Sequence, residues 1–156
     1  MNPSSLFTDA LLAYSVHEHQ LGHVKRVDMW VHMRSFTIQD DGRGMGLDRP
    51  GYVESLMGLL AGRGGEVQLH GVGLAIIAAA TPLLTVESRR GDKLWTQRFA
   101  WGMPEAPATS APAGSAKGTR ITIELAPGAP ALDVATVQAQ AARWQQSNPG
   151  LAIEVH

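Results

Sequence analysis

Two glycine-containing segments hold the residues of this chain that are best suited to bind an anion. The first, at residues 40–45, reads DDGRGM, and the second, at residues 69–75, reads LHGVGLA and opens a run of small and apolar residues. Glycine lets the backbone approach a ligand closely, and a helix that starts at such a loop points free N–H groups and its positive dipole end at an anion. Together the segments predict a nucleotide site, with phosphate as the anion.

Strand alternation places Asp40 at the rim of a buried layer. In the preceding strand Phe36, Ile38 and Asp40 share one face, so the carboxylate must find donors or suffer a desolvation penalty of roughly several kcal/mol. In a later strand Thr119 shares its face with isoleucines, which predicts that Thr119 lies beside Asp40. A carboxylate and a hydroxyl facing an apolar slot suit the amino group and ring edge of adenine. The alternative is that Asp40 caps the glycine turn that follows it.

The elements that position these residues follow from periodicity and turn residues. Helical spacing predicts helices at residues 5–21, 50–60, 71–80 and 133–146. Runs of β-branched and aromatic residues predict strands at 27–32, 34–40, 83–90, 93–101, 119–125 and 151–155. Residues 61–68 are expected to form a loop, and the Pro-, Ala-, Ser- and Gly-rich residues 103–117 a mobile loop. The fold class predicted is an α/β (α+β) two-layer sandwich, with a mixed β-sheet covered on one face by helices.

Composition limits the function classes. The 156 residues are 44% hydrophobic, which predicts a single domain over 1–156. Thirteen basic and 14 acidic residues are mixed along the chain, so no nucleic-acid partner is expected. There is no cysteine, which excludes disulfides and thiolate metal sites. The first residues lack signal-peptide character and no apolar run is long enough to span a bilayer, so a cytoplasmic protein without a membrane partner is expected.

Taken together, these motifs resemble those of the GHKL superfamily of ATP-binding domains, which have the Bergerat fold. The nearest likeness is to the ATPase domain of the DNA gyrase B protein, in which a strand leads into a DDGRG turn and an LHGVG loop opens a small-residue helix. Shorter matches are LGH at residues 21–23, GMP at 102–104, KGT at 117–119 and QSNPGL at 146–151. The resemblance covers nearly the whole chain.

The resemblance implies an ATP or ADP site and gives its residues roles. Asp40 would accept the adenine amino group with support from Thr119 through a shared water, and Arg43 would lie beside the base, paired with Glu18. The pocket residues implied are Gly44 and Met45 for the base and Leu69, His70, Gly71, Val72 and Gly73 for the phosphate-binding loop, which follows a short lid at 61–68.

The first helix departs from the family pattern. Alignment without gaps puts Ala10 where the family has a Glu that activates the attacking water, and Tyr14 where it has an Asn that holds Mg²⁺. Asp9 is adjacent in sequence, but one residue along a helix turns a side chain by about 100°. No metal-binding residue is therefore assigned, and hydrolysis is expected to be very slow or absent.

Other departures shape the functional hypotheses. Val67 and Gln68 stand where gyrase-like proteins have consecutive glycines, which predicts a stiffer lid hinge. The family's transducer and DNA-cleavage segments have no counterpart in the 156 residues, so the chain is not expected to be a topoisomerase by itself. The favoured hypothesis is an adenine-nucleotide binding module. Its alternatives are an active ATPase that uses Asp9 or Glu18 as the base, or a nucleotide-free domain that binds another chain or a second copy.

Two further clusters have competing interpretations. His17, His19 and His23 could bind a metal ion, but they are more simply read as the polar face and end of the first helix. Trp95, Phe99 and Trp101 are expected to alternate along one strand face, where they would either pack in the core or form a surface for self-association.

Overall fold

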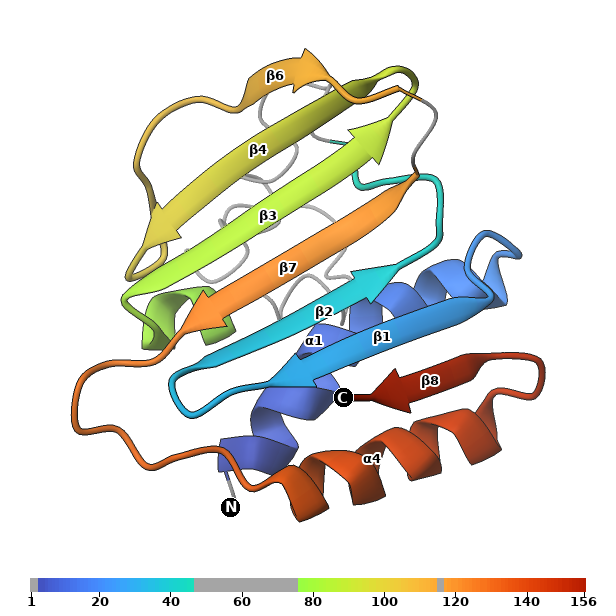
Figure 1. Cartoon of the computed structure of the whole chain (residues 1–156), viewed down its shortest axis with the longest axis vertical. Coiled ribbons are helices and arrows are strands. Elements are labelled where there is room, and N and C mark those ends of the chain that lie inside the picture. The colour runs from blue at the N-terminus through green and yellow to red at the C-terminus, as the bar shows by residue number, and fades with distance from the viewer. Residues whose placement is uncertain (1–2, 47–75, 115–116) are drawn as a thin grey trace, which may run out of the picture.

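The centre of the molecule is an eight-stranded sheet, seen in Figure 1. The computed structural model describes residues 3–46, 76–114 and 117–156. The strand order is β5-β4-β3-β7-β2-β1-β8, and β6 also pairs with β4. The strands are β1 (Arg26–Val31), β2 (Ser35–Asp40), β3 (Leu83–Arg90), β4 (Lys93–Ala100), β5 (Met103–Pro104), β6 (Thr109–Pro112), β7 (Gly118–Glu124) and β8 (Ala152–Val155). Because β8 runs parallel to β1 while the other pairs are antiparallel, the sheet is mixed, as predicted.

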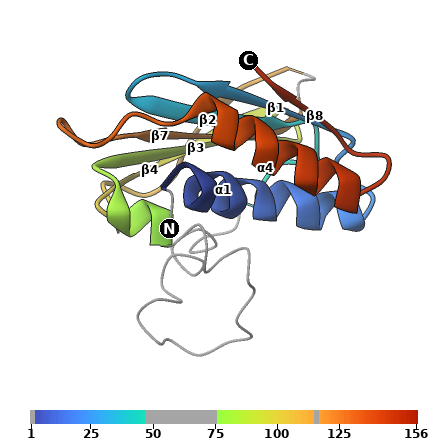
Figure 2. The same ribbon diagram turned by 90° about the horizontal axis from the view of Figure 1, so that it is seen from below.

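Helices cover one face of this sheet. The helices α1 (Pro3–Gln20) and α4 (Val134–Ser147) lie on the same side, together with a helical segment at residues 76–80 (Figure 2). Among the described residues, no helix covers the other face, and none is long and apolar enough to cross a membrane. This arrangement confirms the predicted two-layer sandwich. The predicted helix 50–60, the lid 61–68 and residues 71–75 of the next helix lie outside the described residues.

The two long helices begin and end within two residues of the predicted bounds. At the end of α1, Gly22 adopts φ 89°, and His23 N–H donates to the Glu18 carbonyl at 2.9 Å, a glycine-dependent helix stop. At the start of α4, the Asp133 carboxylate accepts the Ala135 N–H at 3.2 Å. The position of Gly22 therefore determines where α1 ends and the connection to β1 begins.

The core lies between the helices and the inner face of the sheet. Its fully buried large side chains include Leu11 and Leu12 from α1, Phe36 and Ile38 from β2, and Ile123 from β7. Burial of this kind contributes about 1.5–3 kcal/mol for each large aliphatic or aromatic side chain. Because β2 and β7 are adjacent and central, the residues at their ends are held by strands that are paired on both sides.

The predicted loop over residues 103–117 contains two short strands, which the prediction missed. Within it, β5 and β6 both pair with β4, and the Gln97 side chain donates to the Ala106 carbonyl. All six residues of β5 and β6 are exposed, so these strands form through main-chain hydrogen bonds and leave no apolar pattern in the sequence. The loop is instead folded along the outer edge of β4.

The expected aromatic row is also corrected. Phe99 is fully buried and Trp95 packs against the core, which supports the core interpretation for these two residues. Trp101 is not in the strand, because β4 ends at Ala100 and Trp101 lies in a turn with φ 51° and 56% exposure. The three side chains therefore do not form one surface.

Candidate functional site

Asp40 is the last residue of β2, and the residue is 4% exposed. Oδ1 accepts the Gly42 N–H at 3.0 Å and the Thr119 N–H at 3.1 Å, and Oδ2 accepts the Ser15 hydroxyl at 2.8 Å. Burial raises the pKa of Asp40, and the hydrogen bonds from Gly42, Ser15 and Thr119 oppose that rise. The burial of Asp40 that strand alternation predicted is confirmed. Asp40 also caps the glycine turn, as the alternative proposed, since Gly42 is one of the donors.

The turn that follows Asp40 is fixed to β3 and β7. Gly44 has φ 85°, and a Cβ there would lie 2.7 Å from the Arg89 carbonyl oxygen. The main chain of Met45 is held on both sides, because its N–H donates to Thr119 Oγ1 at 2.9 Å and its carbonyl accepts the Ser88 hydroxyl at 2.6 Å. Met45 itself is fully buried. The turn is therefore a preformed part of the fold.

Thr119 contacts Asp40 through its main chain. Its backbone N–H donates to the carboxylate directly, and its hydroxyl oxygen accepts the Met45 N–H. A donor on the main chain is fixed by strand pairing and needs no particular side chain. Thr119 is thus a neighbour of Asp40, as predicted, and its support of Asp40 through a shared water stays a prediction.

Arg43 and Glu18 form the ion pair that the resemblance implied. The guanidinium meets Glu18 side-on, with Nε 3.3 Å from Oε1 and Nη2 3.3 Å from Oε2. Glu18 is nearly buried while Arg43 is half exposed, at 48% of its side chain. Tyr14, one helical turn earlier, donates its hydroxyl to the same Oε1 at 3.0 Å. These three residues form a chain of contacts from α1 to the turn, which we call the Tyr14–Glu18–Arg43 network.

Asp9 does not point toward this network. Its carboxylate accepts the Trp144 indole N–H at 2.8 Å and both oxygens lie within 3.1 Å of Gln140 Nε2, all from α4. Its neighbour Ala10 is buried and has no titratable group. The structure therefore places Asp9 in the contact between α1 and α4, and not beside Asp40.

These contacts predict a structural role for Asp9. The Asp9→Ala variant should lose about 1–2 kcal/mol of unfolding free energy in urea denaturation, because partly buried donors on α4 are left without an acceptor. The matched Asp9→Asn variant keeps an oxygen for Trp144 and should lose less. Equal stability of Asp9→Ala and wild type would contradict this role.

Sequence reasoning missed two serines that complete the site. Ser15 lies three residues before Glu18, which is the spacing of neighbours on one helix face, and Ser88 shares its strand face with Val86 and Leu84. Both are buried. Helix and strand periodicity could have identified both serines as site residues, since a buried serine hydroxyl usually donates to a nearby carboxylate or carbonyl.

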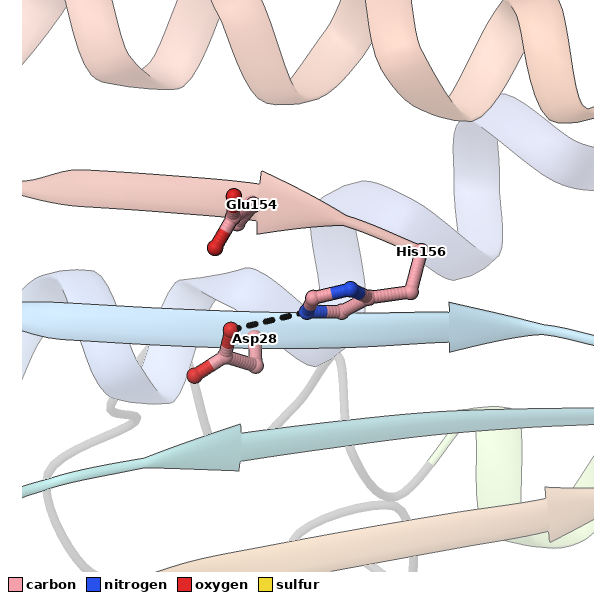
Figure 3. A group of neighbouring side chains, drawn as sticks. All are labelled: Asp28, Glu154 and His156. Carbon is pink, nitrogen blue, oxygen red and sulfur yellow. Dashed lines mark hydrogen bonds and ion pairs between the residues drawn. The ribbon is translucent and has the colours of Figure 1, made fainter.

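A separate group of titratable residues lies on the uncovered face of the sheet, at β1 and β8. Ligand atoms of Asp28, Glu154 and His156 lie within 4.8 Å of one another (Figure 3). Arg26 already pairs with both carboxylates, and this contact lowers the pKa of Asp28. The group is thus an ion-pair network that ties β1 to β8. No such group forms at His17, His19 and His23 in the part of the chain that the structure describes.

The predicted phosphate loop lies outside the described residues. Leu69, His70, Gly71, Val72 and Gly73 all fall in the range 47–75, so their assignment stays a prediction. The described part of the site consists of Asp40, the glycine turn and the face of α1 that meets them.

A mixed sheet with helices on one face, and a buried aspartate that leads from an inner strand into a glycine turn, match the GHKL type of fold that the sequence resembles. Within that class the domain is gyrase-B-like. It is 32% identical to the DNA gyrase B protein of Haloferax volcanii in a 107-residue alignment that covers 58% of this chain. It is 28% identical to the type 2 topoisomerase B protein of Aquifex aeolicus in a 130-residue alignment that covers 73% of this chain. The chain spans 16% of the length of each of these relatives.

A solved structure shows the same architecture. The 43K ATPase domain of Thermus thermophilus gyrase B, in complex with an aminocoumarin, superposes with a TM-score of 0.79 at 22% identity, over 96% of this chain and 42% of that one. No protein-family model matches the sequence. The expected GHKL resemblance is thereby confirmed at the level of fold and of relationship to gyrase B.

Proposed function

We propose that this domain binds an adenine nucleotide, ATP or ADP, at Asp40 and hydrolyses it slowly or not at all. The observation that supports this most is the buried Asp40 carboxylate, held by three donors. A carboxylate has about four acceptor positions, so one remains, on Oδ2. Adenine offers an amino group at the corresponding ring edge, where guanine has an oxygen acceptor. The remaining position therefore suits adenine.

The relatives support the same class of ligand. Two are gyrase or topoisomerase B proteins, and the solved structure with the same fold is named as an ATPase domain. The Asp40 turn and the Arg43–Glu18 pair lie in one preformed site of this fold. Adenine-nucleotide binding is the function that fits both the fold and the donor pattern.

Slow hydrolysis follows from the face of α1. A general base must have an oxygen free to take a proton from water. Of the two carboxylates on α1, Asp9 is engaged by α4. Glu18 accepts from Tyr14 and Arg43 on Oε1, and its Oε2 is buried beside the Arg43 cation, which disfavours its taking a proton from water. Ala10, at the position implied for the base, has only a methyl group. The loss of a positioned base lowers rates by about 10²- to 10⁴-fold.

Calorimetric titration with ADP, ATP and GDP tests the proposal. We expect ADP and ATP to bind with comparable affinity and GDP to bind at least tenfold more weakly, since its oxygen would face Asp40. An absence of heat with millimolar ADP would rule out the binding function. Phosphate release from ATP well above background would contradict slow hydrolysis and would revive the ATPase alternative.

The raised pKa of Asp40 predicts how ADP affinity depends on pH. Above that pKa the carboxylate is ionised and affinity should be constant. As the pH falls through the raised pKa, Oδ2 loses its charge and affinity should fall by about tenfold per pH unit, beginning at a higher pH than the ordinary value of 3.8 would give. Calorimetry across a pH series would measure this, and an affinity that is flat down to the ordinary value would contradict it.

A further inference from the structure

The GHKL fold implies a Mg²⁺ ion beside the phosphates, so the residues of α1 can be tested for fit to that ion. Mg²⁺ takes oxygen ligands, usually carboxylates, at about 2.0–2.1 Å in a strict octahedral arrangement. The side chain at the implied ligand position is Tyr14, which is 4% exposed and donates its hydroxyl to Glu18 at 3.0 Å. A neutral phenol whose proton is directed at a carboxylate is a poor ligand for a hard cation.

The neighbouring carboxylates already have protein partners. The Asp9 carboxylate faces Gln140 and Trp144 on α4, and both oxygens of Glu18 face Arg43. Asp40 accepts three donors. Within the described residues, Asp9, Glu18 and Asp40 thus each accept from at least one protein donor, and the one buried oxygen among them without a hydrogen bond, Glu18 Oε2, lies 3.3 Å from the Arg43 cation. The residues do not fit the ion that the fold implies.

Tyr14 lies between the two recognised parts of the site. The next residue, Ser15, contacts Asp40, and Glu18, one turn later, contacts Arg43. Glu18 Oε1 accepts from both Tyr14 and Arg43 Nε. The phenol thus helps to fix the orientation of the carboxylate that in turn holds Arg43 against the turn.

We propose that the site binds its nucleotide without a divalent metal ion. In this proposal Tyr14 occupies the position of the metal ligand, and its hydroxyl orients Glu18 toward Arg43. The nucleotide part of this statement rests on the proposed function, whereas the closed metal position does not. In this arrangement Tyr14 is a positioning residue that acts on the ligand through Glu18 and Arg43.

The first measurement compares ADP affinity in EDTA and in excess Mg²⁺. For the wild type we expect dissociation constants, expressed for total ADP, that agree within about threefold. Affinity at least tenfold tighter in Mg²⁺ would overturn the proposal.

The positioning role of Tyr14 is tested in the same titration. Tyr14→Phe removes only the hydroxyl and should weaken ADP binding about three- to tenfold in both buffers. If Tyr14 acts through Arg43, the same substitution in an Arg43→Ala background should have no further effect. A full additional loss in that background, or no loss in the single variant, would overturn the positioning role.

The second measurement needs no nucleotide. Paramagnetic Mn²⁺ is added to the free protein while backbone amide signals are recorded, in an Asp28→Asn background that weakens the carboxylate group on the opposite face of the sheet. We expect the signals of residues 10–18 to keep their intensity at one equivalent of Mn²⁺. Selective broadening of those signals would show an open metal position and overturn the inference. If ADP fails to bind, the proposed function is rejected. The Mn²⁺ titration still decides whether α1 can bind a divalent metal ion.

Discussion

Asp40→Asn is expected to abolish nucleotide binding while the domain stays folded. Oδ1 accepts two backbone N–H groups, so the carbonyl oxygen of asparagine must occupy that position. The amide NH₂ is then forced into the Oδ2 position, where Ser15 can accept from it. It would present a donor to the adenine amino group, which is also a donor. The lost charge-assisted bond and the donor clash together amount to about 3 kcal/mol or more, or over 100-fold in affinity.

The stability of this variant separates a binding effect from unfolding. Because burial disfavours the ionised carboxylate, a neutral side chain of the same shape should leave the thermal midpoint unchanged or raise it. Asp41→Asn is the matched control, since Asp41 is exposed and keeps an oxygen for the Lys25 and Arg26 N–H groups. Wild-type ADP affinity in Asp40→Asn would rule out Asp40 as the base-recognition residue.

Gly118→Ala is expected to have the largest effect on stability. Gly118 opens β7 with φ +117°, and a Cβ there would lie 2.0 Å from the Asp40 carbonyl oxygen. That neighbour is main chain at the end of β2, so it can move only if the pairing of two central strands is disturbed. The strain and displaced backbone should cost about 4 kcal/mol or more, which is a large share of the roughly 5–15 kcal/mol of a typical domain.

The control is another glycine with positive φ. Gly91, in the turn between β3 and β4, has φ +65°, and a Cβ there would meet no atom within 4 Å. Gly91→Ala should therefore cost only its backbone strain, about 1–2 kcal/mol. Urea denaturation of both variants measures the difference. Equal losses would mean that the close approach of β7 to Asp40 contributes nothing to stability.

The parts of this fold that depend on local rules could be predicted from sequence. Strand alternation placed Phe36, Ile38 and Asp40 on one buried face, because it depends only on backbone geometry. The end of α1 followed from Gly22, whose positive φ few other residues adopt. The Arg43–Glu18 pair came from the family resemblance and is present.

The parts that depend on packing between distant segments could not be predicted. Asp9 is separated from Trp144 by 135 residues, and nothing near Asp9 indicates that its partner is an indole. The hydrogen bond from Met45 N–H to the Thr119 hydroxyl depends on the path of the turn after Asp40, which no local pattern in the sequence indicates. The strands β5 and β6 were not predicted, because strands that pair at an exposed sheet edge need no apolar side chains.

The pairing of β2 with β7 also determines when the pocket can exist during folding. Asp40 receives one donor from 79 residues further along the chain, and β1 pairs with β8 from Arg26 to Ala152. Contacts of such long sequence separation form late, after the entropy of closing large loops has been overcome. On a ribosome, Asp40 would be synthesised long before its Thr119 donor, and a ligand that needs both would recognise only chains in which the central sheet is complete. Nucleotide binding would thus stabilise the finished fold and none of its precursors.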